Sequence, residues 1–437
     1  MQLKEMIRRL IIPQLPGTQP EIEPGLYHYM QEAGGMYTRF HLRVEPDGRG
    51  LLLANASASA HLSQTGVLIA KELLEGVDQG QVLRDLAAGY RGASRETMLK
   101  DVERIDRLIR RLGNPEDNYP ITNLEDAAVS PYEAQLIAPL EANIPLASPD
   151  KLLPIIDRLW EVAIPHVTLL VPENPNGEYL VRAVERAEDL GLIAGVRGRA
   201  TDLSQDNLLK ELAVAGVDHV TVVYASADSA VHDVLLGEGD HALVAQVVRA
   251  IHDNEVASVI EIPLIQQTVD RLEETLASLQ ILDVHNYSFF AISTAEGNID
   301  PSSKSGPLLA AALPQTAAHV EELAGQMDVR FIWQPPVERD PTLSMAEQVQ
   351  QGPRCSGDVS VRIEPDGEVI PPRGPYQSAG NIINHEWIRI WNNHAFRNYR
   401  ERVQSPTRCD ECPGLAICAA DCPRKPEGWA LAEEQLS

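Results

Sequence analysis

Two neighbouring stretches near the start of the chain have strand patterns: residues 36–44 are extended, with polar and apolar residues alternating from 39 onward, and residues 50–56 form a second, apolar stretch. A period of two is typical of strands that have one buried face. Pro46-Asp47-Gly48 lies between the two stretches and is a strong turn signal. The pattern therefore predicts a β-hairpin.

Three helical patterns follow the hairpin, because the spacing of the apolar residues lengthens to three and four. The predicted helices cover residues 67–74, 82–90 and 94–112. Ser63 and Ser94 stand where an N-cap residue is expected. With the hairpin, these helices predict a compact unit over residues 21–115, preceded by a proline-containing arm over residues 1–20.

From about residue 135 onward, apolar strands alternate with amphipathic helices. The predicted strands are 133–143, 166–172, 193–197, 219–224, 257–263 and 288–291, and the predicted helices are 149–160, 180–190, 203–215, 243–252 and 269–279. This alternation is typical of an α/β fold with a parallel sheet, and we expect a partial barrel over residues 135–345. Ligands of such a fold bind at the carboxyl ends of the strands. A polar linker over residues 116–134 separates it from the N-terminal unit.

Cysteines occur only near the C-terminus, in a segment predicted to fold separately over residues 346–437. A hairpin is expected around Pro365-Asp366-Gly367, followed by a helix over 387–402. The five cysteines are Cys355, Cys409, Cys412, Cys418 and Cys422, and the last four have the spacing C-x2-C-x5-C-x3-C. Thiolates at this density are typical metal ligands, although reduced thiols without a metal are the alternative.

The net charge of −26 is concentrated in the middle of the chain. Residues 201–300 contain 3 Lys and Arg against 17 Asp and Glu. Such a surface argues against nucleic acid as a partner, and it is either a solvated face or a surface for a basic partner. No apolar stretch is long enough to span a bilayer or to act as a secretory signal, so we expect no membrane contact and a cytoplasmic location.

Residues 346–437 resemble the SPASM extension of radical S-adenosylmethionine (SAM) enzymes that modify peptides. The resemblance rests on the order Cys355, Gly367 and then the four-cysteine run. The middle of the chain resembles the partial (β/α)6 barrel of the same enzymes. There, Glu173 stands at the family's Gly-Gly-Glu turn, and Asp228, His232-Asp233 and Gly237 match its D-x-x-x-H-D-x-x-x-G stretch.

The N-terminal unit resembles the winged-helix recognition element of enzymes that modify ribosomally made peptides (RiPPs). A similar element acts alone as the peptide chaperone of pyrroloquinoline quinone synthesis. The resemblance implies that a precursor peptide is bound as an added strand along residues 50–56, against the helix over 94–112. The expected peptide-binding residues are Leu51, Leu52, Leu53, Ala54, Arg104, Arg107 and Arg111.

The chain departs from this family where the chemistry is expected. The catalytic signature C-x3-C-x2-C is missing, and residues 121–165 contain neither cysteine nor histidine. The predicted first strand leads through a short turn, residues 144–148, into the next helix. Val171-Pro172-Glu173 replaces the Gly-Gly-Glu turn, and Val-Pro restricts the close backbone approach that glycines allow. We therefore expect no radical SAM cluster and no binding of SAM.

The resemblance also implies ligands for two auxiliary clusters, and both sets are incomplete. Cys355 and Cys422 would share one site, in which Pro372 occupies a ligand position, and Cys409, Cys412 and Cys418 would form the other. A single [4Fe-4S] cluster or a zinc ion therefore remains possible, with or without Cys422 joining the other three.

These features predict a catalytically inactive radical SAM/SPASM homologue that binds a precursor peptide or an active homologous enzyme in a RiPP-like pathway. Two alternatives remain at this point. One is an enzyme of different chemistry at the barrel mouth, which would use a C-terminal metal or iron-sulfur centre. The other is a structural subunit of a larger complex.

Overall fold

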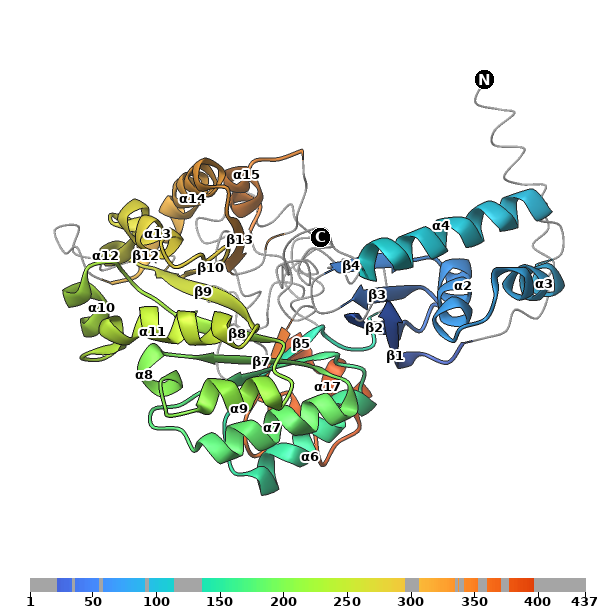
Figure 1. The fold of residues 1–437 in the computed structure, drawn as a ribbon, viewed down its shortest axis with the longest axis horizontal. Coiled ribbons are helices and arrows are strands. Elements are labelled where there is room, and N and C mark those ends of the chain that lie inside the picture. Colours follow the sequence, from blue (N-terminus) through green and yellow to red (C-terminus); the bar gives the residue numbers. More distant parts are fainter. Residues whose placement is uncertain are drawn as a thin grey trace, which may run out of the picture.

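A computed structural model provides the fold of the chain (Figure 1). It describes residues 22–33, 36–54, 58–90, 94–113, 136–294, 306–334, 337, 342–352, 360–370 and 377–396. Within these ranges, no helix is both long and apolar enough to cross a membrane.

The N-terminal unit, defined here as residues 25–113, begins with a four-stranded antiparallel sheet of order β1-β2-β3-β4. Its strands are β1 (Gly25–Ala33), β2 (Met36–Val44), β3 (Gly50–Ala54) and β4 (Ala58–Leu62). The predicted hairpin is present as β2 and β3. β1 and β4 were not predicted, because β1 is rich in polar and aromatic residues and β4 consists mostly of small residues.

Three helices complete the N-terminal unit, as the apolar spacing predicted. They are α2 (Gln64–Leu74), α3 (Gln79–Gly89) and α4 (Arg95–Gly113). Ser63 Oγ accepts the amide of Gly66, and Ser94 Oγ accepts the amide of Thr97, so both serines act as the expected caps. The buried residues of α4 follow the helical period and are Met98, Val102, Ile109 and Leu112.

A ten-stranded sheet forms the centre of the molecule, in the order β13-β10-β9-β8-β7-β6-β5-β14-β15-β16. Its strands are β5 (Glu141–Pro145), β6 (His166–Leu170), β7 (Ile193–Gly198), β8 (His219–Val223), β9 (Ala257–Leu264), β10 (Asn286–Ala291), β13 (Arg330–Gln334), β14 (Ser360–Ile363), β15 (Glu368–Ile370) and β16 (Gly380–Asn381). Neighbours from β13 to β14 pair in parallel, whereas β15 and β16 are antiparallel. The predicted parallel sheet is thus confirmed.

Helices connect successive parallel strands and pack together on one face of the sheet (Figure 1). They are α6 (Pro149–Glu161), α7 (Gly177–Leu190), α8 (Ala200–Leu203), α9 (Leu208–Val214), α10 (Ser229–Leu236), α11 (Asp240–Asp253), α12 (Gln266–Val269), α13 (Leu272–Gln280), α14 (Leu313–Met327) and α15 (Met345–Gln350). The expected helices over 203–215 and 269–279 are each divided in two. The smaller elements are β11 (Ser293–Thr294), β12 (Leu308–Leu309) and η1 (Ala310–Ala312).

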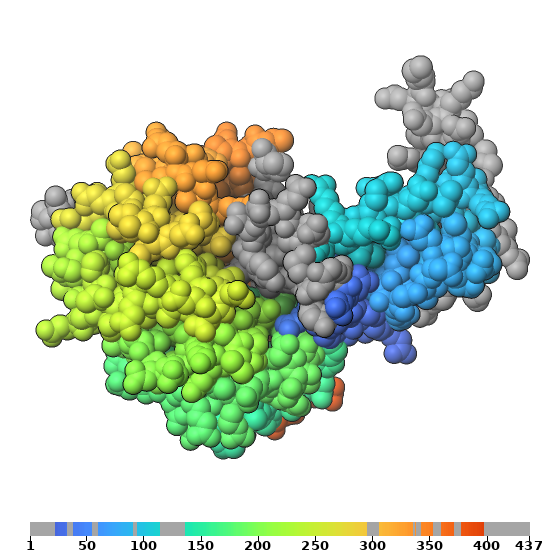
Figure 2. Space-filling view, in the orientation of Figure 1, coloured from blue at the N-terminus to red at the C-terminus, as the bar shows by residue number. Residues whose placement is uncertain are grey.

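The C-terminal hairpin extends the central sheet instead of standing apart. β14 pairs in parallel with β5, and Gly367 has the positive φ of +89° that its turn requires. The following helix, α17 (Trp387–Trp391), is held by its two indoles, because Trp387 and Trp391 donate to the carbonyls of Ile137 and Leu136 at 2.7 and 2.8 Å. Both indoles are therefore part of, or packed against, the hydrophobic core. In the space-filling view the N-terminal unit forms a separate lobe beside this body (Figure 2).

Candidate functional site

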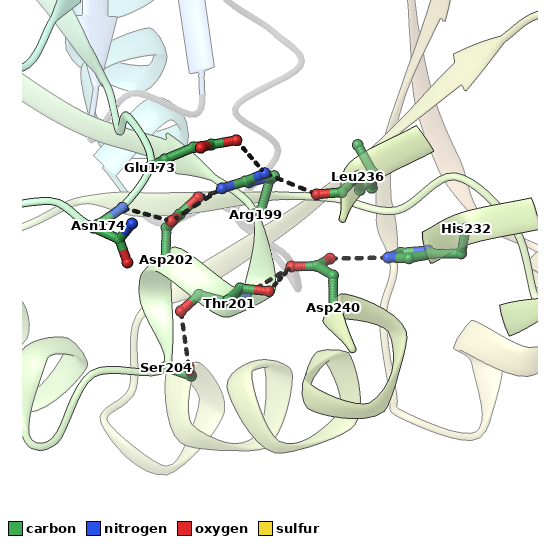
Figure 3. Close-up of polar contacts among 9 residues, drawn as sticks. All are labelled: Glu173, Asn174, Arg199, Thr201, Asp202, Ser204, His232, Leu236 and Asp240. Carbon is green, nitrogen blue, oxygen red and sulfur yellow. Dashed lines mark hydrogen bonds and ion pairs between the residues drawn. The ribbon is translucent and has the colours of Figure 1, made fainter. Parts of the chain in front are cut away.

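The carboxyl ends of β6, β7 and β8 bring together charged and polar residues, of which the sequence had marked Glu173 and His232 (Figure 3). Glu173 follows β6, Arg199 follows β7, and His232 lies on α10 beyond β8. Asp202 and Asp240 join them from α8 and from the start of α11. Strand ends of a parallel sheet converge at one edge, and this edge is where α/β proteins bind their ligands.

Arg199 organises the first half of this cluster. Its guanidinium donates to Asp202 at 2.7 and 3.2 Å, to Glu173 at 3.0 Å and to the carbonyl of Leu236 at 2.8 Å. Asp202 is buried and also accepts the amide of Asn174 at 3.1 Å. The hydrogen bond to Asp202, assisted by Glu173, raises the pKa of Arg199, so this cation stays charged and both carboxylates are compensated.

His232 and Asp240 form the second half and are fully buried. His232 Nδ1 accepts the amide of Ala225 at 3.3 Å, so its Nε2 must be the donor to Asp240 Oδ2 at 2.9 Å. Asp240 Oδ1 accepts both the amide and the hydroxyl of Thr201, at 2.7 and 2.5 Å. Burial alone would raise the pKa of Asp240, but these hydrogen bonds outweigh it and lower the pKa. Neither ring nitrogen of His232 is left to act as a general base.

The other residues of the D-x-x-x-H-D-x-x-x-G stretch build the corner between α10 and α11. Asp228 caps α10 by accepting the amide of Ala230 at 2.9 Å. Asp233 accepts the amides of Gly239 and His241, both at 3.0 Å, and these bonds lower its pKa. Each of these side chains therefore stabilises the local backbone through its hydrogen bonds.

The connection between β5 and α6 is as short as the sequence predicted. β5 ends at Pro145 and α6 begins at Pro149, so only residues 146–148 lie between them. After the neighbouring strand, the Val171 amide donates to the carbonyl of Arg197 at 2.8 Å. The segment that replaces the Gly-Gly-Glu turn therefore continues the β6–β7 ladder.

Sequence reasoning missed a polar cluster on the sheet face opposite the helices. The strand register aligns Glu141 with His166 and Thr168 with Gly195, which in turn aligns with His219. The Thr168 hydroxyl donates to Glu141 at 2.6 Å, and the two imidazoles lie 5.0 Å apart. A Cβ on Gly195 would lie 2.3 Å from His219 Nε2, so this glycine makes room for the ring.

Burial dominates the titration of this cluster. It lowers the pKa of His166 and of His219 to about 3 each, and the two rings are therefore neutral. It also raises the pKa of Glu141, although the bond from Thr168 acts in the opposite direction. The signal was present as a polar residue at the start of β5, β6 and β8, but only the register shows that these residues meet.

The structure corrects the predicted peptide edge. β3 pairs with β2 on one side and with β4 on the other, so the expectation that residues 50–56 present a free edge is wrong. The side chains of β3 are buried as well: Leu51 and Leu53 pack on Leu140, and Leu52 and Ala54 lie in the core of the N-terminal unit. While the N-terminal unit stays docked on the central body, a peptide cannot contact these four residues.

The three arginines predicted to bind peptide lie together on the exposed side of α4. Arg104, Arg107 and Arg111 are all exposed, and spacings of three and four residues place them on one helix face. Arg107 pairs with Glu103 at 4.0 Å, a weak surface contact. This basic stripe is available to a ligand.

The cysteines predicted to bind metal, Cys355, Cys409, Cys412, Cys418 and Cys422, lie outside the described residues. Within the described part of the chain, no group of three or more His, Cys, Asp and Glu side chains is placed to bind a metal ion. A metal or cluster would therefore depend on these thiols, whose sulfur chemistry suits iron and zinc.

Comparison with known protein families identifies the C-terminal part of the chain. Residues 355–413 match SPASM, an iron-sulfur cluster-binding domain. Three of the five cysteines lie within this match. No curated protein sequence matches the chain.

Comparison with solved structures identifies the fold. SuiB of Streptococcus suis bound to S-adenosylmethionine superposes with a TM-score of 0.57 at 14% identity, over 91% of this chain and 95% of SuiB. SuiB bound to the precursor peptide SuiA gives a TM-score of 0.54 at 13% identity, over 91% and 95%. The chain is thus similar in fold to SuiB over nearly its whole length.

Proposed function

We propose that this chain is a catalytically inactive relative of radical SAM enzymes that modify RiPP precursor peptides, and that it binds such a peptide. In this proposal residues 21–115 are a winged-helix recognition element, 135–345 a partial (β/α)6 barrel and 346–437 a SPASM-like domain. The connection of β5 to α6 through residues 146–148 is the observation that supports inactivity most directly. So short a connection without cysteine cannot surround a cluster that needs three thiolates.

The ion pair between Arg199 and Glu173 supports the same conclusion. By the resemblance, Glu173 would contact the amine of a bound methionine group. Here the Arg199 guanidinium lies 3.0 Å from that carboxylate and supplies the positive charge instead. A cofactor amine would have to displace a cation that is also bound to Asp202.

Peptide binding is proposed along the outer edge of β4, which replaces the β3 edge expected from sequence. β4 is the last strand of the N-terminal sheet, so an added strand could extend the sheet beside it. Ala58 of β4 pairs with Ala54 of β3, and Ala54 pairs with Phe40 of β2. The Phe40 ring lies against Gly113, so the end of α4 packs on this row of the sheet. The basic stripe of α4 suits an acidic peptide, and SuiB, similar in fold, has been solved with its precursor peptide SuiA.

The first expected result is that the protein does not cleave SAM. Reduced, anaerobically reconstituted protein incubated with the cofactor should yield 5′-deoxyadenosine at the level of a no-protein sample, because no thiolates are available at the β5–α6 turn. Turnover above that level would show that the inactive assignment is wrong. A cysteine-complete radical SAM enzyme, assayed in parallel, verifies the reductant.

The second expected result concerns the basic stripe. An acidic precursor peptide encoded by a neighbouring gene should bind with roughly micromolar affinity, and reversing Arg104, Arg107 and Arg111 to Glu should weaken binding about 10- to 100-fold at low salt. A matched variant reverses three exposed cations elsewhere, Lys151, Arg182 and Lys210, and should bind as wild type. If both variants lost the same amount of affinity, the net charge of the protein and not the position of the stripe would explain the effect. No change in either variant would remove the stripe from the binding site.

The third expected result concerns metal. Protein purified without oxygen should contain iron or zinc, and Cys409→Ala, Cys412→Ala and Cys418→Ala should each lower the metal content, because these thiols are the proposed ligands. Elemental analysis with the visible absorption spectrum measures this. Metal content unchanged in all three variants would exclude a cluster at these thiols.

A further inference from the structure

The N-terminal unit contacts the central body through β3, whose Leu51 and Leu53 pack on Leu140, and through one face of β2. Arg39, His41 and Arg43 alternate along this strand, so their side chains point the same way. Arg39 donates to the carbonyl of Leu192 at 3.1 Å, and Arg43 donates to the carbonyl of Ala138 at 3.1 Å. The unit is thereby attached at the amino ends of β5 and β7.

Two histidines of the N-terminal unit meet at Gly191, the residue that ends α7. His41 Nε2–H donates to the Gly191 carbonyl. The His28 ring lies against the same residue, since a Cβ on Gly191 would be 2.6 Å from His28 Nδ1. The two rings stack 5.1 Å apart, and Trp160 packs edge-on to His28 at 6.4 Å. Glycine is required at this point both for the close approach and for its φ of +77°.

The Gly191 carbonyl favours a positive charge on His41, but the charged and titratable groups that face these rings oppose one. Around His41 these are His28 on β1, Arg39 on β2 and His166 on β6. Burial is the largest effect and lowers the pKa of His41 to about 3, and it also lowers the pKa of His28. Both rings therefore enter the joint as neutral imidazoles.

Acidic groups at this joint are bound to Arg39 instead. Its Nη2 pairs with Glu188 of α7, and its Nη1 lies 3.4 Å from Asp218, which precedes β8. Burial raises the pKa of Asp218 to about 6, although Arg39 and the Ala194 amide act in the opposite direction. A carboxyl whose pKa is raised in the docked state takes up its proton more readily there, so Asp218 opposes the histidines and offsets part of their effect on acidification.

We infer that this histidine joint is an acid-sensitive latch, closed only while His28 and His41 are uncharged, and that their protonation releases the N-terminal unit as a folded body. The unit has hydrophobic clusters of its own, so release leaves its core intact. A released histidine has its ordinary pKa near 6.5, so at about pH 5 protonation of His41 alone lowers the docking equilibrium about 30-fold. The inference does not rest on the proposed peptide binding.

Small-angle scattering and far-UV circular dichroism of the full chain test the latch between about pH 7.5 and pH 5. The radius of gyration should rise on acidification while the dichroism stays constant. His41→Gln, which keeps an N–H donor but does not titrate, should move the midpoint to lower pH. His285→Gln, at an exposed histidine, should leave it unchanged.

A glycine pair tests the same joint at neutral pH. Gly191→Ala should raise the radius of gyration at about pH 7.5, because its Cβ collides with the His28 ring. Gly239→Ala introduces a similar backbone strain, at a φ of +84° with no atom near its Cβ, and should not. A constant radius in wild type down to pH 5, an unshifted midpoint in His41→Gln, or loss of dichroism in step with the expansion would each overturn the latch.

Discussion

Replacing Asp240 by alanine is expected to destabilise the protein by about 3–5 kcal/mol, the cost typical of breaking a buried pair. Asp240 is fully buried and accepts hydrogen bonds from His232 and from both donors of Thr201. The alanine variant leaves all three donors without their acceptor, and a buried donor without an acceptor loses its full desolvation energy. Urea unfolding at neutral pH measures the difference.

Two control variants identify the cause. Asp240→Asn keeps an acceptor oxygen and should cost less than the alanine. Asp206→Ala removes an exposed carboxylate from the same region and should stay within about 0.5 kcal/mol of wild type. An alanine variant at position 240 as stable as Asp206→Ala would mean that the network does not support the fold.

Acidification from about pH 7.5 to pH 5 is expected to remove about 2 kcal/mol of stability for each of His166 and His219. Their folded-state pKa is about 3, whereas the unfolded chain titrates near 6.5. The unfolded state therefore binds more protons below pH 6.5, so this stability is present above pH 6.5 and is lost as the pH falls towards 3. Glu141, whose pKa is raised, acts in the opposite sense and offsets part of the loss.

Single variants separate the histidines from the carboxyl group. His166→Gln and His219→Gln should each reduce the pH dependence of the free energy of unfolding by about 2 kcal/mol over this range. His285→Gln, at an exposed ring, should leave the pH dependence unchanged. Parallel pH profiles for wild type and both buried-site variants would show that these rings are not held neutral.

The carboxyl edge of the sheet illustrates how a ligand-binding motif can have a purely structural use. His232, Asp233 and Asp228 stand in the order that the resemblance associates with a cofactor site. In this chain their polar atoms bind backbone amides and Asp240. A sequence pattern specifies residue types and spacing, but not which of their hydrogen bonds are already made within the protein.

The spacing of apolar residues predicted most helices and strands correctly. It failed for segments that form a strand only because they pair with a neighbouring strand. β2, β3 and the three N-terminal helices follow from apolar spacing. β4 does not, because Ala58–Leu62 consists mostly of small residues and is stabilised as a strand by pairing with β3. Missing β4 changed the functional prediction, since it moved the free edge away from Leu51–Ala54.

The sequence by itself determined the α/β alternation, the absence of cysteine near β5 and the concentration of thiols at the C-terminus, because these depend only on residue type and order. Tertiary structure decided which strand is an edge, which carboxylate meets Arg199 and how His28 and His41 meet at Gly191. Those outcomes depend on register and on packing between separate elements, which for His41 and Gly191 lie 150 residues apart. The spacing of apolar residues along the sequence cannot predict such contacts, because it indicates only which face of its own helix or strand a residue occupies.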